Sequence, residues 1–213
     1  MTPIGLFDAD TGQQAGRTAG VTPALVLDNK DPQGLGRVKV KFPNLSDDDI
    51  GHWARVAVLM AGNQRGTFFL PEAGDEVLVA FEAGDITRPF ILGGLWNGQD
   101  APPDTNADGK NNLRLIKSRS GHVIRLDDTD GSEKIEIVDK SGNNHLTFDT
   151  ANNTITIASA KDITLDASQG TIKLTAQNIS LSSTADTKVD AQSGLTLQAS
   201  GNTTVKGALV NIN

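Results

Sequence analysis

The feature that most constrains this chain is a short repeat that begins near Thr154 and continues to the C-terminal end. Two apolar residues, separated by one polar residue, recur at intervals of seven to nine residues in a background of Thr, Ser, Asn, Gln and Ala, as in ITI at 155–157 and ISL at 179–181. A fixed period of this kind indicates stacked short strands, because no single unit can bury its apolar face without its neighbours.

Four interpretations of this repeat compete. A monomeric β-solenoid would have only two or three coils with open ends, and an antiparallel meander would leave two edge strands and an uncovered face. A disordered polar tail does not require isoleucine and leucine to recur in register. In the fourth arrangement three copies wind around one axis. A strand of five or six residues spans about 17–20 Å, so two aliphatic side chains per strand suffice to fill the narrow prism that results.

The sequence therefore favours an all-β homotrimer whose C-terminal part is an intertwined, triple-stranded β-helix. Its polar positions would face outward, where Thr is a good strand former. The residues predicted to fill the trimer interior are the aliphatic positions of the repeat: Ile155, Ile157, Ile163, Leu165, Ile172, Leu174, Ile179, Leu181, Val189, Leu195, Leu197 and Val205.

Composition divides the chain into two parts. Aromatic residues make up only 4% of the sequence, and all nine of them lie at or before Phe148. Pro, Gly, Asp and Asn crowd together between Asn97 and Asn112, which is typical of a linker. We predict four segments: an N-terminal segment at 1–19, a barrel at 20–96, the linker at 97–112 and the needle-like β-helix at 113–213.

The barrel prediction depends on several short apolar runs separated by turn signals. These runs are VKVKFP (38–43), HWARVAVLM (52–60), GTFFLP (66–71), DEVLVAF (75–81) and PFILGGLW (89–96), and the fourth places Val77, Val79 and Phe81 on one face. Five or six short strands in under a hundred residues, without helical periodicity, favour a small closed barrel, with a sandwich as the alternative.

Charge and residue usage exclude several classes of protein. The net charge of −7 disfavours binding to nucleic acid or to anionic lipid surfaces. The sequence contains no cysteine, which excludes disulfides, thiol chemistry and cysteine-based metal sites. The N-terminus lacks the pattern of a signal peptide, and no run of apolar residues is long enough for a transmembrane helix. We therefore expect synthesis in the cytoplasm.

Candidate chemistry is sparse, and for each candidate a structural role is the better interpretation. The glycines of QGLG at 33–36 lack the context of a phosphate loop, and the run Asp47–Asp49 is more typical of a solvated loop than of a cation site. The acidic residues within 72–76 resemble a glycosidase pair only superficially. His122 has no partner acid or nucleophile at a defined spacing, and Trp53 is more typical of packing than of base stacking. We predict no cofactor and no metal.

Residues 28–103 resemble a known family. The stretches DNKDPQGLGRVKVKFP, HWARVAVLMAG and GTFFLPEAGDEVLVAFEAGDITRPFILGGLWNGQDAPP are similar to the oligonucleotide/oligosaccharide-binding (OB) barrel in the central spike of contractile injection systems: phage baseplate assembly protein V, type VI secretion (VgrG) spikes and extracellular phage-tail-like particles. The motif residues are Asp31, Pro32, Gly36, Arg37, Trp53, Arg55, Pro71, Gly74, Asp75, Glu76, Gly84, Asp85, Arg88 and Pro89.

The resemblance implies a structural spike that punctures membranes and is not an enzyme. In those families a trimeric β-helix follows the barrel, which agrees with the interpretation of the repeat. The short segment 1–19 implies that a separate trimeric hub protein binds at the barrel end. A small PAAR-repeat tip protein would cap the other end, at Leu209, Val210, Asn211, Ile212 and Asn213. The spike would act within a phage tail or phage-tail-like particle, with its tip crossing the target envelope.

Two alternatives remain at this point. A trimeric tailspike depolymerase would cut surface polysaccharide, but it would need acidic pairs and aromatic residues, and the sequence after Phe148 has no aromatic residue. A β-solenoid adhesin would be a monomer. The oligomeric state therefore discriminates the spike from the adhesin, and a polysaccharide assay discriminates the spike from the depolymerase.

Overall fold

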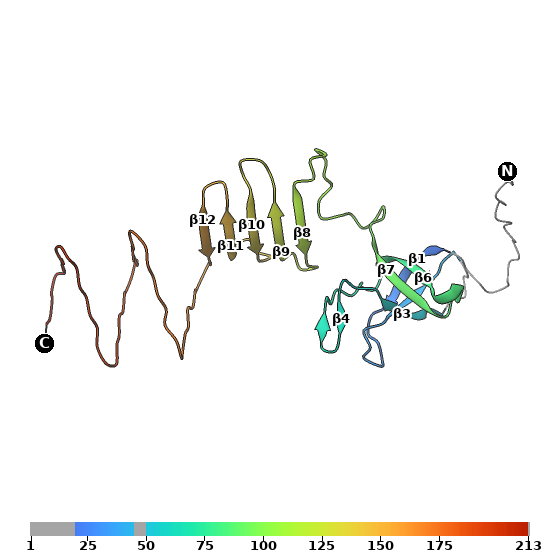
Figure 1. Cartoon of the computed structure of the whole chain (residues 1–213), viewed down its shortest axis with the longest axis horizontal. Coiled ribbons are helices and arrows are strands. Elements are labelled where there is room, and N and C mark those ends of the chain that lie inside the picture. Colours follow the sequence, from blue (N-terminus) through green and yellow to red (C-terminus); the bar gives the residue numbers. More distant parts are fainter. Residues whose placement is uncertain (1–19, 45–49, 213) are drawn as a thin grey trace, which may run out of the picture. The chain divides into compact units, whose positions relative to one another are not determined.

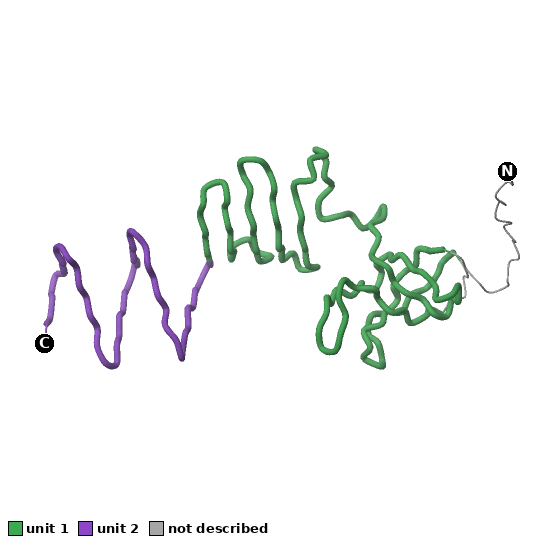
Figure 2. Tube along the Cα trace, in the orientation of Figure 1, with its two compact units in different colours: residues 1–158 green, residues 159–213 purple. Residues whose placement is uncertain are grey.

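The computed structural model describes residues 20–44 and 50–212. The chain divides into two compact units, Met1–Ala158 and Ser159–Asn213 (Figure 2). Every regular element of the described residues is a strand, apart from one short 3-10 turn, η1 (Glu82–Gly84). No helix long and apolar enough to span a membrane occurs in these ranges. The described part of the chain is thus all-β, as predicted.

The first part of unit 1 is a closed five-stranded barrel. It consists of β1 (Val21–Asp28), β2 (Val38–Lys41), β3 (His52–Val56), β6 (Glu76–Phe81) and β7 (Pro89–Leu95), in the order β1-β2-β3-β7-β6 (Figure 1). Strand β1 pairs with both β2 and β6, and β3 pairs with β7 in parallel, whereas the other pairs are antiparallel. This strand order is that of an OB barrel and confirms the predicted barrel over the predicted sandwich.

The barrel core forms because inward positions alternate along each strand. In β6 the predicted face, Val77, Val79 and Phe81, is buried, and Ala24 and Val26 of β1 point into the same core. The complete buried apolar set is Ala24, Val26, Val38, Val40, Phe42, Ala54, Val77, Val79, Phe81 and Ile91. Phe42 and Phe81 pack edge to face within this core, with their ring centroids 5.1 Å apart.

The segment between β3 and β6 differs from the sequence prediction. GTFFLP does not form a barrel strand: only the two-residue strands β4 (Ala61–Gly62) and β5 (Arg65–Gly66) form here, and they pair with each other as a hairpin. Phe68 and Phe69 are 77% and 63% exposed. The apolar run was misleading because only Leu70 of this run packs against the barrel core, whereas its two aromatic side chains are exposed. Conversely, β1 was not singled out, since Pro23 interrupts its pattern.

The second part of unit 1 is a single antiparallel sheet. Its strands are β8 (Leu113–Lys117), β9 (Val123–Asp127), β10 (Lys134–Val138), β11 (His145–Asp149) and β12 (Thr154–Ala158), and each pairs with the next along the chain. The four connecting turns each contain one residue with positive φ: Gly121, Gly131, Gly142 and Asn153. The segment predicted as the start of an intertwined needle therefore forms a meander of five strands within one chain.

Unit 2 differs from unit 1 in its secondary structure. Residues 159–212 contain no assigned strand, and the trace runs in long extended segments joined at corners (Figure 2). Its aliphatic residues are exposed in the single chain, with Ile172 at 51% and Leu181 at 79%. Within residues 159–212 the repeat thus has neither an intrachain strand partner nor buried aliphatic residues, and the predicted β-helix stays a prediction.

Candidate functional site

The sheet β8–β12 carries one apolar face. Cross-strand register aligns its side chains in two rows that run across all five strands. The first row is Ile116, Ile124, Ile137, Leu146 and Ile157, and the second is Arg114, Leu126, Ile135, Phe148 and Ile155. Cross-strand neighbours of this kind lie about 4.5–5.5 Å apart, so the first row is apolar across all five strands and the second is apolar from β9 to β12.

These rows are uncovered in one chain. Ile116, Ile135 and Ile137 are 52%, 45% and 48% exposed, and Ile155 on the last strand is 66% exposed. The opposite face is mixed: it includes Leu115 and Val123 as well as an ion pair between Arg125 and Glu136, which lie opposite each other on β9 and β10. A contiguous exposed apolar surface of this extent indicates a site of interaction with another molecule or chain, because the solvent-exposed surface of a monomeric protein rarely has one.

The predicted interior residues divide between this face and unit 2. Ile155 and Ile157 lie on the two rows, whereas the ten from Ile163 to Val205 lie in the strandless segment. Sequence reasoning missed the apolar residues of the rows on β8 to β11. The signal was present as period-2 alternation in LRLIK, VIRLD, KIEIV and HLTFD. Of the predicted tip residues, Leu209 and Ile212 are 78% and 91% exposed, and Asn213 lies outside the described residues.

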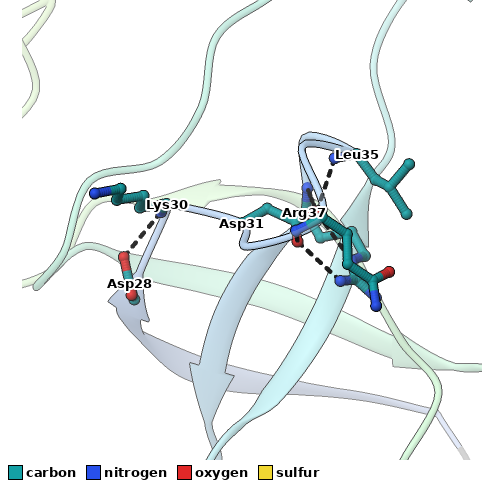
Figure 3. Close-up of polar contacts among 6 residues, drawn as sticks. Asp28, Lys30, Asp31, Leu35 and Arg37 are labelled. Atoms are coloured by element: carbon teal, nitrogen blue, oxygen red, sulfur yellow. Dashed lines mark hydrogen bonds and ion pairs between the residues drawn. The ribbon is translucent and has the colours of Figure 1, made fainter.

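The loop between β1 and β2 is organised around Asp31 (Figure 3). Its carboxylate accepts hydrogen bonds from the backbone N–H groups of Gln33 (3.0 Å), Leu35 (3.1 Å) and Arg37 (3.2 Å). The Arg37 guanidinium donates two more, from Nε to Oδ2 at 2.9 Å and from Nη2 to Oδ1 at 2.8 Å. The side chain of Asp31 is only 3% exposed. These contacts fix the loop in one conformation.

The electrostatics of this loop follow from the same contacts. The Arg37 side chain, with the backbone donors behind it, holds the pKa of Asp31 well below its usual range, and burial opposes this effect. Arg37 also lies over the Trp53 ring, with its Cζ 5.7 Å from the ring centroid. Gly36 adopts φ +71°, which disfavours a residue with a side chain. The motif residues of this loop therefore have structural roles.

The motif segment 71–76 closes one end of the barrel. Asp75 accepts a hydrogen bond from the Glu72 backbone N–H at 2.8 Å and donates its own N–H to the Glu72 carbonyl at 3.0 Å. Gly74, at φ +100°, donates to the carbonyl of Val26. Pro71 accepts from the Asn29 side chain through its carbonyl, and Glu76 accepts from the side chain of Asn97. This acidic segment is a turn in which each carboxylate already has a partner.

The motif residues between 82 and 90 form a second ordered loop. Glu82 forms an ion pair with Arg88, with Nε of Arg88 3.0 Å from Oε2 of Glu82, and Nη2 of Arg55 lies 3.8 Å from the same oxygen. The Arg55 guanidinium also lies over the Phe90 ring, with its Cζ 4.3 Å from the ring centroid. The hydroxyl and the backbone N–H of Thr87 both donate to Asp85, and these hydrogen bonds lower the pKa of that carboxyl. The loop also contains Gly84 at φ +82° and leads into Pro89 at the start of β7.

The remaining chemical candidates do not form a site. His122 accepts a hydrogen bond through Nδ1 from the backbone N–H of Lys140 at 3.2 Å, which ties two turns of the sheet together. Across residues 20–44 and 50–212, no group of three or more His, Asp or Glu side chains is arranged to hold a metal ion. Residues Asp47–Asp49 lie outside the described residues.

Comparison with known proteins agrees with this geometry. Residues 22–96 match a family described as the type VI secretion system/phage-baseplate injector OB domain. The chain is 34% identical over 109 residues to type VI secretion system spike protein VgrG3 of Vibrio cholerae, which covers 47% of this chain and 11% of that protein. It is 32% identical over 114 residues to spike protein VgrG1a of Pseudomonas aeruginosa, which covers 48% of this chain and 18% of that protein.

The closed barrel and this match agree on the class of the domain: residues 22–96 form a closed five-stranded barrel and match the type VI secretion system/phage-baseplate injector OB domain. Over about half of its length the chain is similar to VgrG spike proteins. The chain spans less than a fifth of the length of these relatives.

Proposed function

We propose that this protein is a trimeric, membrane-puncturing spike at the tip of a contractile tail or injection apparatus. The family of residues 22–96 supports a place in a type VI secretion or phage-baseplate injector. Type VI spike proteins are the named relatives. The barrel would form a collar, and residues 113–213 would form the needle.

The observation that carries the trimer is the uncovered pair of apolar rows on β8–β12. A single sheet with an apolar face is unstable alone and requires a second layer. Residues 20–44 and 50–212 supply no second layer, because residues 159–212 have neither strands nor buried side chains. Three copies of the sheet, with their rows turned toward a common axis, would cover one another. The aliphatic residues of the repeat in unit 2 would then extend this apolar interior along the axis, with one pair of side chains per strand.

The mechanism of such a needle is mechanical. Strands paired between chains leave no free lateral edge, so the backbone hydrogen bonds run continuously and make the fibre rigid. A contracting sheath would drive this rigid body through the target envelope. No catalytic residue is required, and the carboxylates that a depolymerase would use are engaged in turns of the barrel. No observation favours the depolymerase alternative.

The two ends of the spike would bind different partners. A trimeric hub would contact the barrel end, including residues 1–19, which lie outside the described residues. The opposite end has exposed Leu209, Val210 and Ile212 in each chain. Three copies would present a blunt apolar platform, which suits a PAAR-type tip protein as a cap.

Sedimentation of the purified chain at micromolar concentration tests this proposal. The expected species is a trimer of about 67 kDa, three times the chain mass of 22.4 kDa. A stable monomer would overturn the proposal, because the apolar rows would then be exposed in the functional protein. A dimer or tetramer would overturn the three-fold arrangement while leaving the family of the barrel unchanged.

A further inference from the structure

The hairpin β4–β5 and its flanks expose apolar side chains that the barrel does not use. Leu59, Met60 and Phe68 are 95%, 53% and 77% exposed. The hairpin strands pair only with each other, Ala61 with Gly66 and Gly62 with Arg65, and extend away from the barrel strands (Figure 1). We refer to residues 59–68 as the arm. An exposed aromatic and two exposed aliphatic side chains on a small hairpin indicate that the arm is covered by something else.

A shallow apolar groove lies on the barrel beside the arm. It is lined by Val56, Val58, Phe69, Leu92, Gly93 and Gly94, which we call the seat, and also by Leu59 and Thr67 near the two ends of the same chain's arm. A β-bulge in the pairing of β6 with β7 leaves Leu92 47% exposed. Gly93 and Gly94 follow within the same strand, so this part of the barrel surface has no side chains.

The two glycines of the seat are not required by the chain's own fold. A Cβ atom added at Gly93 or Gly94 would meet nothing within 4 Å, and neither residue has the positive φ that favours glycine. Glycine within a strand weakens it and often marks a place where another chain approaches closely. The seat is therefore shaped for an external group, and a flat aromatic ring fits a bare, apolar strand surface.

We infer that the arm of one copy of this chain docks on the seat of the next copy, with Phe68 against Leu92, Gly93 and Gly94. This inference deepens the proposed function and rests on the trimer. A closed ring of three needs two different surfaces on each copy, because a three-fold interface joins one patch to another patch. The chain carries such a pair, a projecting arm and an apolar groove.

Two further observations favour a second copy as the occupant. First, each chain has a net charge of −7, yet residues 56–70 contain a single charged residue, Arg65, so this region brings no like charges together. Second, the 16 residues 97–112 connect the barrel to the sheet; a flexible chain of that length spans about 20–24 Å. Once three sheets associate, the barrels are held at an effective concentration of about millimolar, and a modest contact suffices to join them.

Cysteine cross-linking tests this contact cleanly because the chain has no cysteine. In the full chain carrying both Phe68→Cys and Leu92→Cys, mild oxidation should convert the protein into a covalent trimer on a denaturing gel. Each single variant serves as a control and should give no covalent trimer. A monomer band from the double variant would overturn the inference, and a covalent dimer as the end product would replace the ring with a two-fold contact.

Sedimentation of the same samples separates this inference from the proposed function. A trimer in solution without covalent trimer refutes only the arm and seat, whereas a monomer in solution refutes the trimer itself. A second measurement uses Gly94→Gln in the double-cysteine background, because a Cβ atom at Gly94 meets nothing within 4 Å in its own chain and the longer side chain would occupy the seat. We expect the rate of cross-linking to fall about tenfold. Gly98→Gln, at another glycine with open space around it, is the matched control and should leave the rate unchanged. Equal cross-linking rates for the two variants would overturn the assignment of the seat as the docking surface.

Discussion

Replacing Ile172 with aspartate in unit 2 tests the predicted needle interior. Ile172 is 51% exposed in one chain. A trimer that buries this exposed half gains about half of the roughly 1.5–3 kcal/mol that full burial of such a side chain contributes to stability. That is about 1 kcal/mol per chain and about 3 kcal/mol for the three side chains of one layer. Ile172→Asp loses this term and places three carboxyl groups near one axis, each at a cost of several kcal/mol.

The expected result is a large drop in the melting temperature of the trimer, or a monomer in sedimentation at micromolar concentration. The neighbouring Thr171→Asp, which adds the same charge at a predicted outward position, is the control and should leave both quantities nearly unchanged. Burial raises the pKa of the introduced carboxyl above its unfolded value. Stability of the Ile172→Asp trimer should therefore recover as the pH falls below the raised pKa. An Ile172→Asp trimer with unchanged melting temperature would refute the interior assignment.

Three further predictions concern the barrel. Ile91→Ala, at a fully buried core position, should destabilise the barrel by about 2–5 kcal/mol in thermal unfolding, whereas Val21→Ala, at a half-exposed position, should cost far less. Asp31→Asn should lower the melting temperature at neutral pH. Because the folded pKa of Asp31 is depressed, the difference from the parent should persist above the ordinary value of 3.8 and shrink as the pH falls below it; a difference independent of pH would contradict the role of this carboxylate. Glu72→Gln and the parent should both release no reducing sugar from bacterial surface polysaccharide, and cleavage by the parent alone would revive the depolymerase.

The barrel could be predicted from sequence because its inward positions are regular. Val77, Val79 and Phe81 occupy every second position of β6, and all three are buried, whereas Leu78 and Ala80 between them are only partly buried. The same reasoning failed for GTFFLP, since an apolar run does not reveal whether it packs within its own chain or against another. The turn contacts of Asp31 and Asp75 were predicted only as motif positions, because carboxylate hydrogen bonds to backbone N–H groups leave no periodic signal in a sequence.

The sheet and the repeat show a different limit of sequence reasoning. Ile155 and Ile157 were predicted as interior residues, and they share a face with residues up to 40 positions earlier in the chain. The sequence prediction began the needle at Leu113 but did not distinguish strands that pair within the chain from strands that do not. That distinction depends on turn chemistry, which the apolar pattern does not encode.

Turn chemistry explains why intrachain pairing stops at Ala158. Each of the four turns of the sheet contains a residue with positive φ, the last being Asn153, and reversal of a chain into a tight hairpin depends on such residues. Among the described residues after Asn153, none adopts positive φ, and the repeat period shortens to about eight residues, leaving corners of only two or three residues between strands. In the proposed trimer, a chain that does not reverse on itself would continue to the next face of the needle. Its extended segments would then be paired by other copies.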